Sequence, residues 1–218
     1  MRIHLKINTG KVLIPFDHQH YLVGSIHKWL GDNNEHNKIS LYSFSRLIGG
    51  KATKDGLLFE RGASFFFSSF NLGLIKRLVF GIRNDPTMFN DIFVNEIIFE
   101  EDPDLSNKSF FLLGSPIFIK RYDNTGSKHI LYNDSNANTC LSETLTSKLK
   151  IAEIEIEEFS IQFDKSYHGA SVKKVTYKGI ENKVSWCPVK IIASNEIKQF
   201  IWNVGLGNST GIGFGAIK

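Results

Sequence analysis

The sequence is poor in the residues and patterns that mark several common protein classes. Its two cysteines, Cys140 and Cys187, lie far apart and outside any Cys-x-x-Cys pair. Neither a zinc site of common spacing nor a disulfide framework is therefore expected, and both thiols should be reduced, as in a cytosolic protein. No apolar run approaches the roughly 20 residues of a membrane span. The first seven residues alternate in polarity like a strand rather than a signal peptide. We therefore expect a cytoplasmic protein with no membrane partner.

The usual nucleotide-binding loops are also missing. The glycine-rich stretch near the end follows residues 195–204, whose apolar positions have helical spacing. Walker and Rossmann loops instead precede a helix, because the helix N-terminus faces the phosphate, and no Gly-Lys-Ser/Thr is present. Five glycines fall in eleven residues: Gly205, Gly207, Gly211, Gly213 and Gly215. Their backbone N–H groups could cradle phosphate oxygens. The alternative is a glycine-rich exit from a helix into a last strand, with no ligand.

Size and charge leave a broad choice. The 218 residues, of which 42% are hydrophobic, suit one large domain or two of about 100 residues each. The formal net charge of +4 is mildly basic. It is compatible with a nucleic-acid partner without requiring one.

The order of expected elements indicates an α+β fold with a repeated pattern. The first half predicts strands at 3–7, 39–47 and 92–99, helices at 17–30, with Asp17 as N-cap, and 72–79, and a hairpin of 57–60 with 63–68. The second half predicts strands at 116–121, 154–163, 172–177 and 184–193, and helices at 139–151 and 195–203. Each half fits β-α-β-β-α-β, the ferredoxin-like motif that includes RNA-recognition-motif domains. We therefore predict two tandem ferredoxin-like modules, residues 1–113 and 114–218, the second ending in the glycine-rich loop.

The run Phe65-Phe66-Phe67 lies in one of these strands. Alternation sends Phe65 and Phe67 to one face and Phe66 to the other. At least one face must be core, so the run is not interpreted as a platform for stacking bases.

Four features, spread in order along the chain, together resemble one family. They are the double β-α-β-β-α-β pattern, the opening of the first helix in Pro15-Phe-Asp-His-Gln-His-Tyr-Leu22, the strand Leu41-Tyr-Ser-Phe-Ser-Arg-Leu47, and the glycine-rich loop. In these features the sequence is similar to the CRISPR-associated repeat-processing endoribonucleases, which cut precursor CRISPR RNA within its repeats.

The resemblance implies a chemistry without metal or other cofactor. The 2′-hydroxyl attacks its own phosphate and leaves a 2′,3′-cyclic phosphate and a 5′-hydroxyl. This requires one group to take the 2′-OH proton, another to protonate the leaving oxygen, and a cation near the phosphorane. By resemblance these groups lie late in the first helix and in the loop after it, at His27, His36 and Lys38. We hypothesise a His27/His36 proton-transfer pair, with neither role assigned, and Lys38 as charge stabiliser.

Ordinary roles for the same residues stay open. Either histidine could be a solvated side chain, and His18 and His20 are expected to be helix-capping or surface residues. His129 is left as a surface residue.

Members of the family bind RNA through basic residues. In this sequence, basic residues follow the strand that ends near residue 45 and lie on the predicted hairpin near residue 175. The predicted RNA-binding residues are Arg46, Lys51, Lys173 and Lys174, together with Gly205, Gly207, Gly211, Gly213 and Gly215. Any one of these lysines could instead only solvate the surface.

Three functions compete. The leading one is a repeat-cleaving endoribonuclease with CRISPR repeat RNA as its partner. The second is a subunit of a CRISPR interference complex that binds repeat RNA without cutting it. The third is a tandem ferredoxin-like protein for small molecules or protein partners, against which the glycine-rich loop and residues 15–47 argue. The resemblance allows either a monomer or a homodimer.

Overall fold

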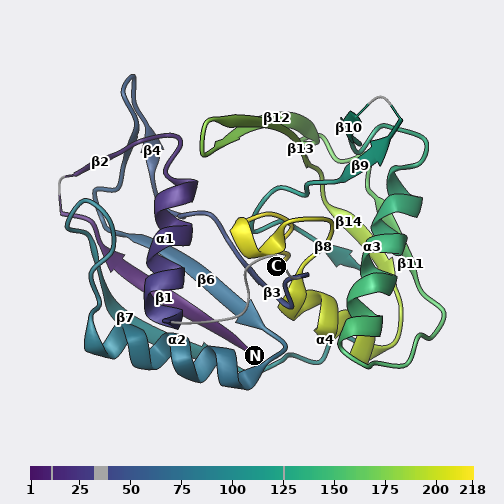
Figure 1. Ribbon diagram of the computed structural model, residues 1–218, viewed down its shortest axis with the longest axis horizontal. Coiled ribbons are helices and arrows are strands. Elements are labelled where there is room, and N and C mark those ends of the chain that lie inside the picture. Colours follow the sequence, from purple (N-terminus) through teal and green to yellow (C-terminus); the bar gives the residue numbers. More distant parts are fainter. Residues whose placement is uncertain (11, 32–38, 125) are drawn as a thin grey trace.

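The computed structural model describes residues 1–10, 12–31, 39–124 and 126–218. It shows two α+β modules side by side (Figure 1). The first holds a four-stranded antiparallel sheet with the strand order β3-β6-β1-β7. Its main elements are β1 (Arg2–Asn8), α1 (Gln19–Leu30), β3 (Tyr42–Phe44), β6 (Ala63–Ser69), α2 (Leu72–Asn84) and β7 (Phe93–Glu100). The predicted β-α-β-β-α-β pattern of the first half is confirmed.

Alternation along the strands decides which side chains face the helices of this module. Leu5 of β1 is fully buried together with Phe65 and Phe67 of β6, on the face covered by α1 and α2. Phe66 points to the other face, where its ring centroid lies 3.8 Å from the guanidinium carbon of Arg2. All three phenylalanines are therefore interior, and the run is not an exposed stacking platform.

The second module repeats the plan with a sheet of order β11-β14-β8. Its main elements are β8 (Phe110–Phe111), α3 (Ala137–Ile151), β11 (Ser160–Phe163), β14 (Val189–Ile192) and α4 (Asn195–Val204). The end of the chain takes the place of a fourth strand. Ile217 forms an antiparallel bridge with Leu113, and the backbones of Leu112 and Lys218 exchange hydrogen bonds of 3.1 and 2.8 Å.

Smaller elements surround the two sheets. They are the three-stranded sheet of β2 (Leu13–Ile14), β5 (Leu57–Leu58) and β4 (Lys51–Ala52), the hairpin of β9 (Lys120–Asp123) and β10 (Gly126–His129), the hairpin of β12 (Ser171–Tyr177) and β13 (Ile180–Trp186), and the 3₁₀ helix η1 (Thr210–Ile212) in the glycine-rich loop. The predicted strand 184–193 is split between β13 and β14. Pro188 stands at the break, where it has no N–H to donate to a ladder.

The predicted hairpin of residues 57–60 with 63–68 was wrong. β5 pairs with β2 and β4, whereas β6 pairs with β1 and β3. The backbone turns between them at Gly62, which has φ of +80° and donates to Phe59 O at 3.2 Å. β6 is drawn into the large sheet because its alternate phenylalanines fill the core beneath the helices.

The predicted strand 116–121 was wrong over residues 116–119, since only Lys120 and Arg121 lie in a strand, β9, and the first strand of the second module is β8. Ile117, Phe118 and Ile119 are all buried, which differs from the alternation of a half-exposed strand. This segment bonds to the glycine-rich loop instead, through Gly215 N to Pro116 O at 2.8 Å and Asn208 N to Phe118 O at 2.7 Å. It is a buried connection that leads into β9.

Each module has its own hydrophobic core. One comprises residues between Ile3 and Val94, and the other comprises residues between Leu105 and Ile217. The predicted boundary at residues 113 and 114 stays a prediction. Because β8 pairs with β14 and Leu105 packs in the second core, we propose a boundary in the segment just after β7. Among the described residues, no helix is both long and apolar enough to span a bilayer.

A buried arginine joins the modules. The Arg2 side chain, 1% exposed, donates from Nε to Ser68 Oγ at 2.7 Å and from Nη2 to the carbonyl oxygens of Trp202 and Ile217 at 3.0 and 2.8 Å. Its guanidinium carbon lies 3.5 Å from the Trp202 ring centroid, opposite Phe66. Burial lowers the pKa of Arg2, while the carboxylates of Glu100 and Asp102 oppose that change. The group keeps its charge because a guanidinium is not deprotonated in proteins.

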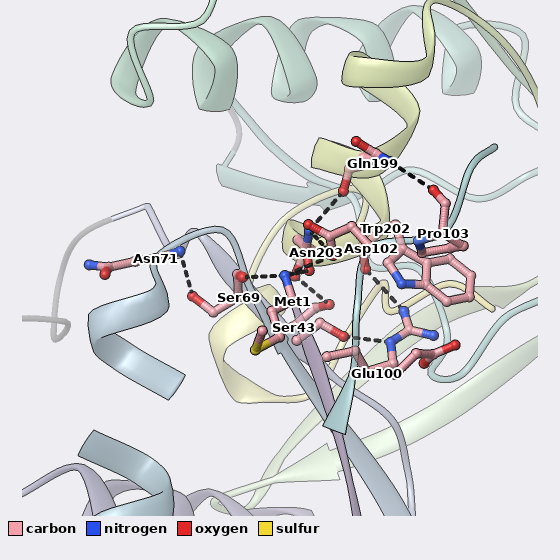
Figure 2. A network of polar contacts seen from close by, with 12 residues as sticks. Met1, Ser43, Ser69, Asn71, Glu100, Asp102, Pro103, Gln199, Trp202 and Asn203 are labelled. Atoms are coloured by element: carbon pink, nitrogen blue, oxygen red, sulfur yellow. Dashed lines mark hydrogen bonds and ion pairs between the residues drawn. The ribbon is translucent and has the colours of Figure 1, made fainter. Parts of the chain in front are cut away.

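Further polar contacts surround this junction (Figure 2). The amino group of Met1 lies 2.8 Å from Asn203 Oδ1 and 2.8 Å from Asp102 Oδ1. Asn203 Nδ2 donates to Asp102 Oδ1 at 2.9 Å, and Ser43 Oγ of β3 donates to Asn203 O at 3.2 Å. The end of α4 is therefore tied to both β1 and β3 of the first module.

We predict that Arg2→Ala lowers the free energy of unfolding by about 3–5 kcal/mol. The change removes the group stacked between two rings and leaves two buried carbonyl oxygens without their donor. Urea unfolding at pH 7 measures the effect. Lys6→Ala is the control, because Lys6 lies on the same strand and face but is exposed and forms an ion pair with Glu96 at the surface. Similar unfolding midpoints for the two variants would contradict the role given to Arg2.

Candidate nucleic-acid interface

A cleft of about 440 Å³ lies between the two modules. The N-terminal end of α1 and the segment after β3 form its wall on the first module, and β12 and the glycine-rich loop form the other. Figure 1 shows the β12–β13 hairpin reaching across toward that end of α1. The lining residues are Phe16, Asp17, His18, Gln19, Leu22, Phe44, Ser45, Arg46, Leu47, Leu57, Lys174, Val175, Thr176 and Gly213.

Arg46 places a positive charge in this cleft, and no carboxylate among the described residues forms an ion pair with it. Its backbone N–H donates to Gly114 O at 3.1 Å, which fixes the start of the side chain. The guanidinium is half-buried, 6.0 Å from the Trp186 ring, and makes neither a hydrogen bond nor an ion pair with the described residues. Burial lowers the pKa of Arg46. An anion entering the cleft would supply the missing charge-assisted hydrogen bonds.

His18 lines the same cleft as a neutral side chain. Its Nδ1 donates to Pro15 O at 2.9 Å, since a carbonyl oxygen can only accept. Burial lowers the pKa of His18, and the positive charge of Arg46 lowers it further, whereas the hydrogen bond to Pro15 O raises it. Nε2 is then left as a hydrogen-bond acceptor. His18 was expected to be a capping or surface residue, but it is buried and its side chain caps no N–H of α1. Asp17 is likewise not the N-cap of α1, a position that His18 occupies.

The predicted basic residues do not all meet in the cleft. Arg46 and Lys174 line it together, and Lys174 also pairs with Glu181 at 3.1 Å. Lys51 lies exposed on β4, paired with Glu60 at 3.3 Å, and Lys173 is exposed on β12. Neither Lys51 nor Lys173 contributes to the lining. Their contact with RNA stays a prediction.

The glycine-rich loop is packed against the protein. All five glycines are buried, and a Cβ on Gly215 would overlap the carbonyl oxygen of Leu206, while one on Gly207 would approach Phe118 O to 2.5 Å. The N–H groups of Gly205, Gly213 and Gly215 donate to carbonyl oxygens within the chain, at 2.8, 3.1 and 2.8 Å. These glycines therefore have a packing role, because only residues without a Cβ allow such close approach. Phosphate contact by the loop stays a prediction.

The tip of this loop contacts α1 and the segment around β3, two of the elements that surround the cleft. The Gln19 side chain at the start of α1 donates to Ile212 O, and Tyr42 Oη of β3 donates to Gly211 O at 3.3 Å. Thr210 Oγ1 donates to Ser40 O at 3.4 Å. The loop thereby sets how α1 and β3 lie against the second module.

Lys148 holds the base of the loop and was missed at the level of sequence. Its Nζ donates to Val204 O at 3.1 Å, to Gly205 O at 3.0 Å and to Thr210 Oγ1 at 3.2 Å. Complete burial lowers the pKa of Lys148 from its usual 10.5 to about 7. Its spacing from Leu141 and Leu145 puts it on the apolar stripe of α3, and this was the signal that could have revealed it.

The predicted catalytic residues lie elsewhere or outside the described part of the chain. His27 is half-buried in the last turn of α1, beside Lys28, which pairs with Asp85 at 2.9 Å. His27 lies nine positions after His18, the cleft residue at the start of α1, or roughly 13 Å along the helix axis. His36 and Lys38 lie outside the described residues. The structure therefore brings Arg46, Lys174 and Gly213 together, but not His27 with them.

Comparison with known proteins identifies similar chains. The family model for CRISPR associated protein Cas6, C-terminal, matches residues 100–218, more than half of the chain. A solved structure described as CRISPR associated protein Cas6 has 23% identity and a TM-score of 0.84, over 100% of this chain and 98% of the other. An RAMP protein binding different RNA substrates has 19% identity and a TM-score of 0.86, over 100% and 98%. The product of a Cas6-related gene from Pyrococcus furiosus has 22% identity and a TM-score of 0.83, over 100% and 97%.

No curated protein matches the chain. At these identities the structural likenesses establish the fold, which is the tandem ferredoxin-like arrangement predicted from the sequence.

We predict that the free energy of unfolding rises with pH above about 7 because of Lys148. Between a folded pKa of about 7 and an unfolded pKa near 10.5, the unfolded chain binds more protons than the folded chain. Stability then increases with pH, with a limiting slope of about 1.4 kcal/mol per pH unit. Urea unfolding of wild type and Lys148→Met at pH 6.5, 8 and 9.5 tests this. The difference between the two should change with pH, whereas Lys150→Met, at an exposed site on the same helix, should follow wild type. Parallel profiles for wild type and Lys148→Met would contradict the prediction.

Proposed function

Because this chain belongs to the Cas6 family of CRISPR-associated proteins, we propose that it is an endoribonuclease that cuts precursor CRISPR RNA within its repeats. The observation that carries the proposal from the chain's own residues is the Arg46 guanidinium, half-buried and without an anionic partner among the described residues. Because the chain belongs to this family, we take the missing anion to be a phosphodiester of the repeat RNA.

In this proposal the inter-module cleft holds a single-stranded part of the repeat. Arg46 donates to a phosphate, and Lys174 adds a second positive charge on the facing wall. His18 Nε2, the acceptor of a neutral imidazole, receives a hydrogen bond from a 2′-hydroxyl or a base amino group. Sequence-specific recognition of RNA favours such unpaired nucleotides, whose polar edges and 2′-hydroxyls are accessible.

The proposed chemistry needs no metal ion. One histidine of the pair His27 and His36 takes the proton from the 2′-hydroxyl, which attacks the adjacent phosphorus. The bond to the 5′-oxygen breaks as the other histidine protonates it, and the products are a 2′,3′-cyclic phosphate and a 5′-hydroxyl. Lys38 stabilises the charge on the phosphorane. The position of His27 in the last turn of α1, nine residues before His36 in the sequence, supports this grouping.

A second candidate is a subunit that binds repeat RNA without cutting it, inside a CRISPR interference complex. The separation along α1 favours it, because the Arg46 cleft can hold RNA at one end of the helix without His27 at the other. Lys28, next to His27, is already paired with Asp85. Association with such a complex, and the choice between monomer and homodimer, remain predictions.

We predict that Arg46→Ala weakens binding of the host's CRISPR repeat RNA by about 10- to 100-fold, because hydrogen bonds to a charged group contribute about 1.5–3 kcal/mol. Fluorescence anisotropy with a labelled repeat at 0.15 M salt measures the dissociation constant. Lys190→Ala is the matched control, since it removes one exposed positive charge on β14, outside the cleft lining. Equal affinities for the two variants would contradict the assignment of the cleft.

We predict metal-free cleavage of the same repeat in EDTA, abolished by a 2′-deoxy substitution at the scissile nucleotide. His27→Ala or His36→Ala should slow single-turnover cleavage by at least ~100-fold if that histidine transfers a proton. Anisotropy of each variant separates a loss of chemistry from a loss of binding. Tight binding by wild type with no cleavage would select the non-cleaving subunit. No binding by wild type would contradict both candidates.

A further inference from the structure

Two hairpins of the second module meet at one end of the molecule. Figure 1 shows β9–β10 beside β13, near the outer edge of the module. The backbone N–H of Lys183 on β13 donates to His129 Nδ1 on β10 at 3.2 Å. Ser185 of β13 also bridges to Ile117, three residues before β9. The two hairpins therefore contact each other, and Lys183 lies opposite Lys174 of the cleft lining.

The register of β9 with β10 puts an aromatic ring and basic groups on the same face. Lys120 lies opposite His129, and Tyr122 lies opposite Ser127, so these four share one face of the hairpin. Lys120 Nζ is 4.9 Å from the centroid of the Tyr122 ring, and Tyr122 is 76% exposed.

The other face of the same hairpin is engaged with helix α3. Arg121 points there and donates to Cys140 O at 2.7 Å and to Glu143 at 3.0 Å. Lys128 lies opposite Arg121 and shares that face. The hairpin is thus anchored on one side, which leaves the Tyr122 face outward.

The positive charges of Lys120 on the outward face and of Lys183 on β13 are not neutralised by the described carboxylates. Other lysines of the protein do form ion pairs, as Lys6 does with Glu96 and Lys51 with Glu60. Lys120 and Lys183 form none with any carboxylate in the part of the chain that the structure describes.

His129 lies between these two lysines. Partial burial lowers the pKa of His129, and the charges of Lys120 and Lys183 lower it further. Its Nδ1 accepts the Lys183 N–H, so the neutral ring carries its hydrogen on Nε2. The surface then has two cations, one ring N–H donor and one exposed aromatic ring.

We propose that Lys120, Tyr122, His129 and Lys183 form a second RNA contact, which binds unpaired nucleotides outside the inter-module cleft. One base stacks on the Tyr122 ring, and the phosphates beside it contact Lys120 and Lys183. His129 Nε2–H donates to a phosphate or base oxygen. A flat exposed ring flanked by cations is the arrangement with which proteins hold single strands. An acidic peptide would use the cations but leave the ring without a base. The inference rests on the proposed function, because it extends the path of the same RNA.

Fluorescence anisotropy tests the surface with two labelled probes, a 12-nucleotide oligoadenylate RNA and the host's repeat RNA. Tyr122→Ala should weaken oligoadenylate binding at least ~5-fold, as the loss of stacking on one base predicts. Tyr122→Phe keeps the aromatic ring and should bind with the wild-type affinity. Lys120→Gln should reduce the slope of log K against log salt by about 0.7, the loss of one phosphate contact on a single strand. Lys128→Gln, the same charge change on the other face of the hairpin, should leave both affinity and slope unchanged. The side chains of Tyr122 and Lys128 are exposed, so these substitutions leave the core intact.

The outcomes separate this surface from the proposed function. Wild-type affinity in Tyr122→Ala, combined with weak binding in Arg46→Ala, would overturn the surface and leave the function standing. Equal effects of Lys120→Gln and Lys128→Gln would also overturn it, because charge alone would then explain binding. A polyglutamate peptide can also be tested as a competitor. If it displaced oligoadenylate equally well from wild type and from Tyr122→Ala, the surface would be assigned to an acidic partner instead. If wild-type protein bound neither RNA, the proposed function would fail first.

Discussion

The Arg2 guanidinium meets two demands that only a planar, fork-shaped cation can meet together. Its faces stack against Phe66 and Trp202, while its edge donates to Ser68 and to two carbonyl oxygens of the second module. A lysine could place one charge there but could neither fill the space between the rings nor reach all three acceptors with fixed geometry. The outer face of the first sheet, which a lone ferredoxin-like module would leave open to water at this point, is thereby covered by α4 and the segment that ends in Ile217.

The glycine-rich loop depends on that junction, since it connects the two segments that Arg2 holds. Lys148 holds the start of the loop by hydrogen bonds to its carbonyl oxygens. Backbone contacts that leave no space for a Cβ at Gly207 or Gly215 fix its turns. Its tip then contacts α1 and β3 through Gln19 and Tyr42. The width of the cleft is thus set by the last residues of the chain, although most of the lining comes from the first module. The glycines matter here for the close approach of backbones, whether or not RNA also touches them.

Local periodicity predicted the elements that are half-buried in a regular way. β1 and α2 each show one apolar face, and the structure confirms them. Periodicity does not predict segments whose second side is covered by residues far away in the sequence. Residues 117–119 are apolar throughout because the glycine-rich loop and β13 enclose them. Phe110–Phe111 is too short a strand to show a period. Arg46 was predicted as an RNA contact, but its partial burial without a counter-ion among the described residues follows only from the docking of the two modules. Arg2 and Lys148 were missed for a related reason, because a long cationic side chain in a sequence is expected to reach water.

In the proposed function, the RNA-binding cleft and the reacting histidine lie at opposite ends of α1. The cleft lies at the N-terminal end of α1 and His27 at its C-terminal end, roughly 13 Å away along a rigid helix. In the proposed function, a nucleotide bound by Arg46 would therefore not be the nucleotide whose 2′-hydroxyl reacts near His27, and the RNA would extend along the protein between them. Binding energy gained in the cleft would then act on cleavage by holding the scissile nucleotide in place, which reduces the entropy lost on reaching the transition state. Such an arrangement allows one scaffold to bind repeat RNA with or without cutting it, because residues at one end of α1 can change while the cleft at the other end is kept.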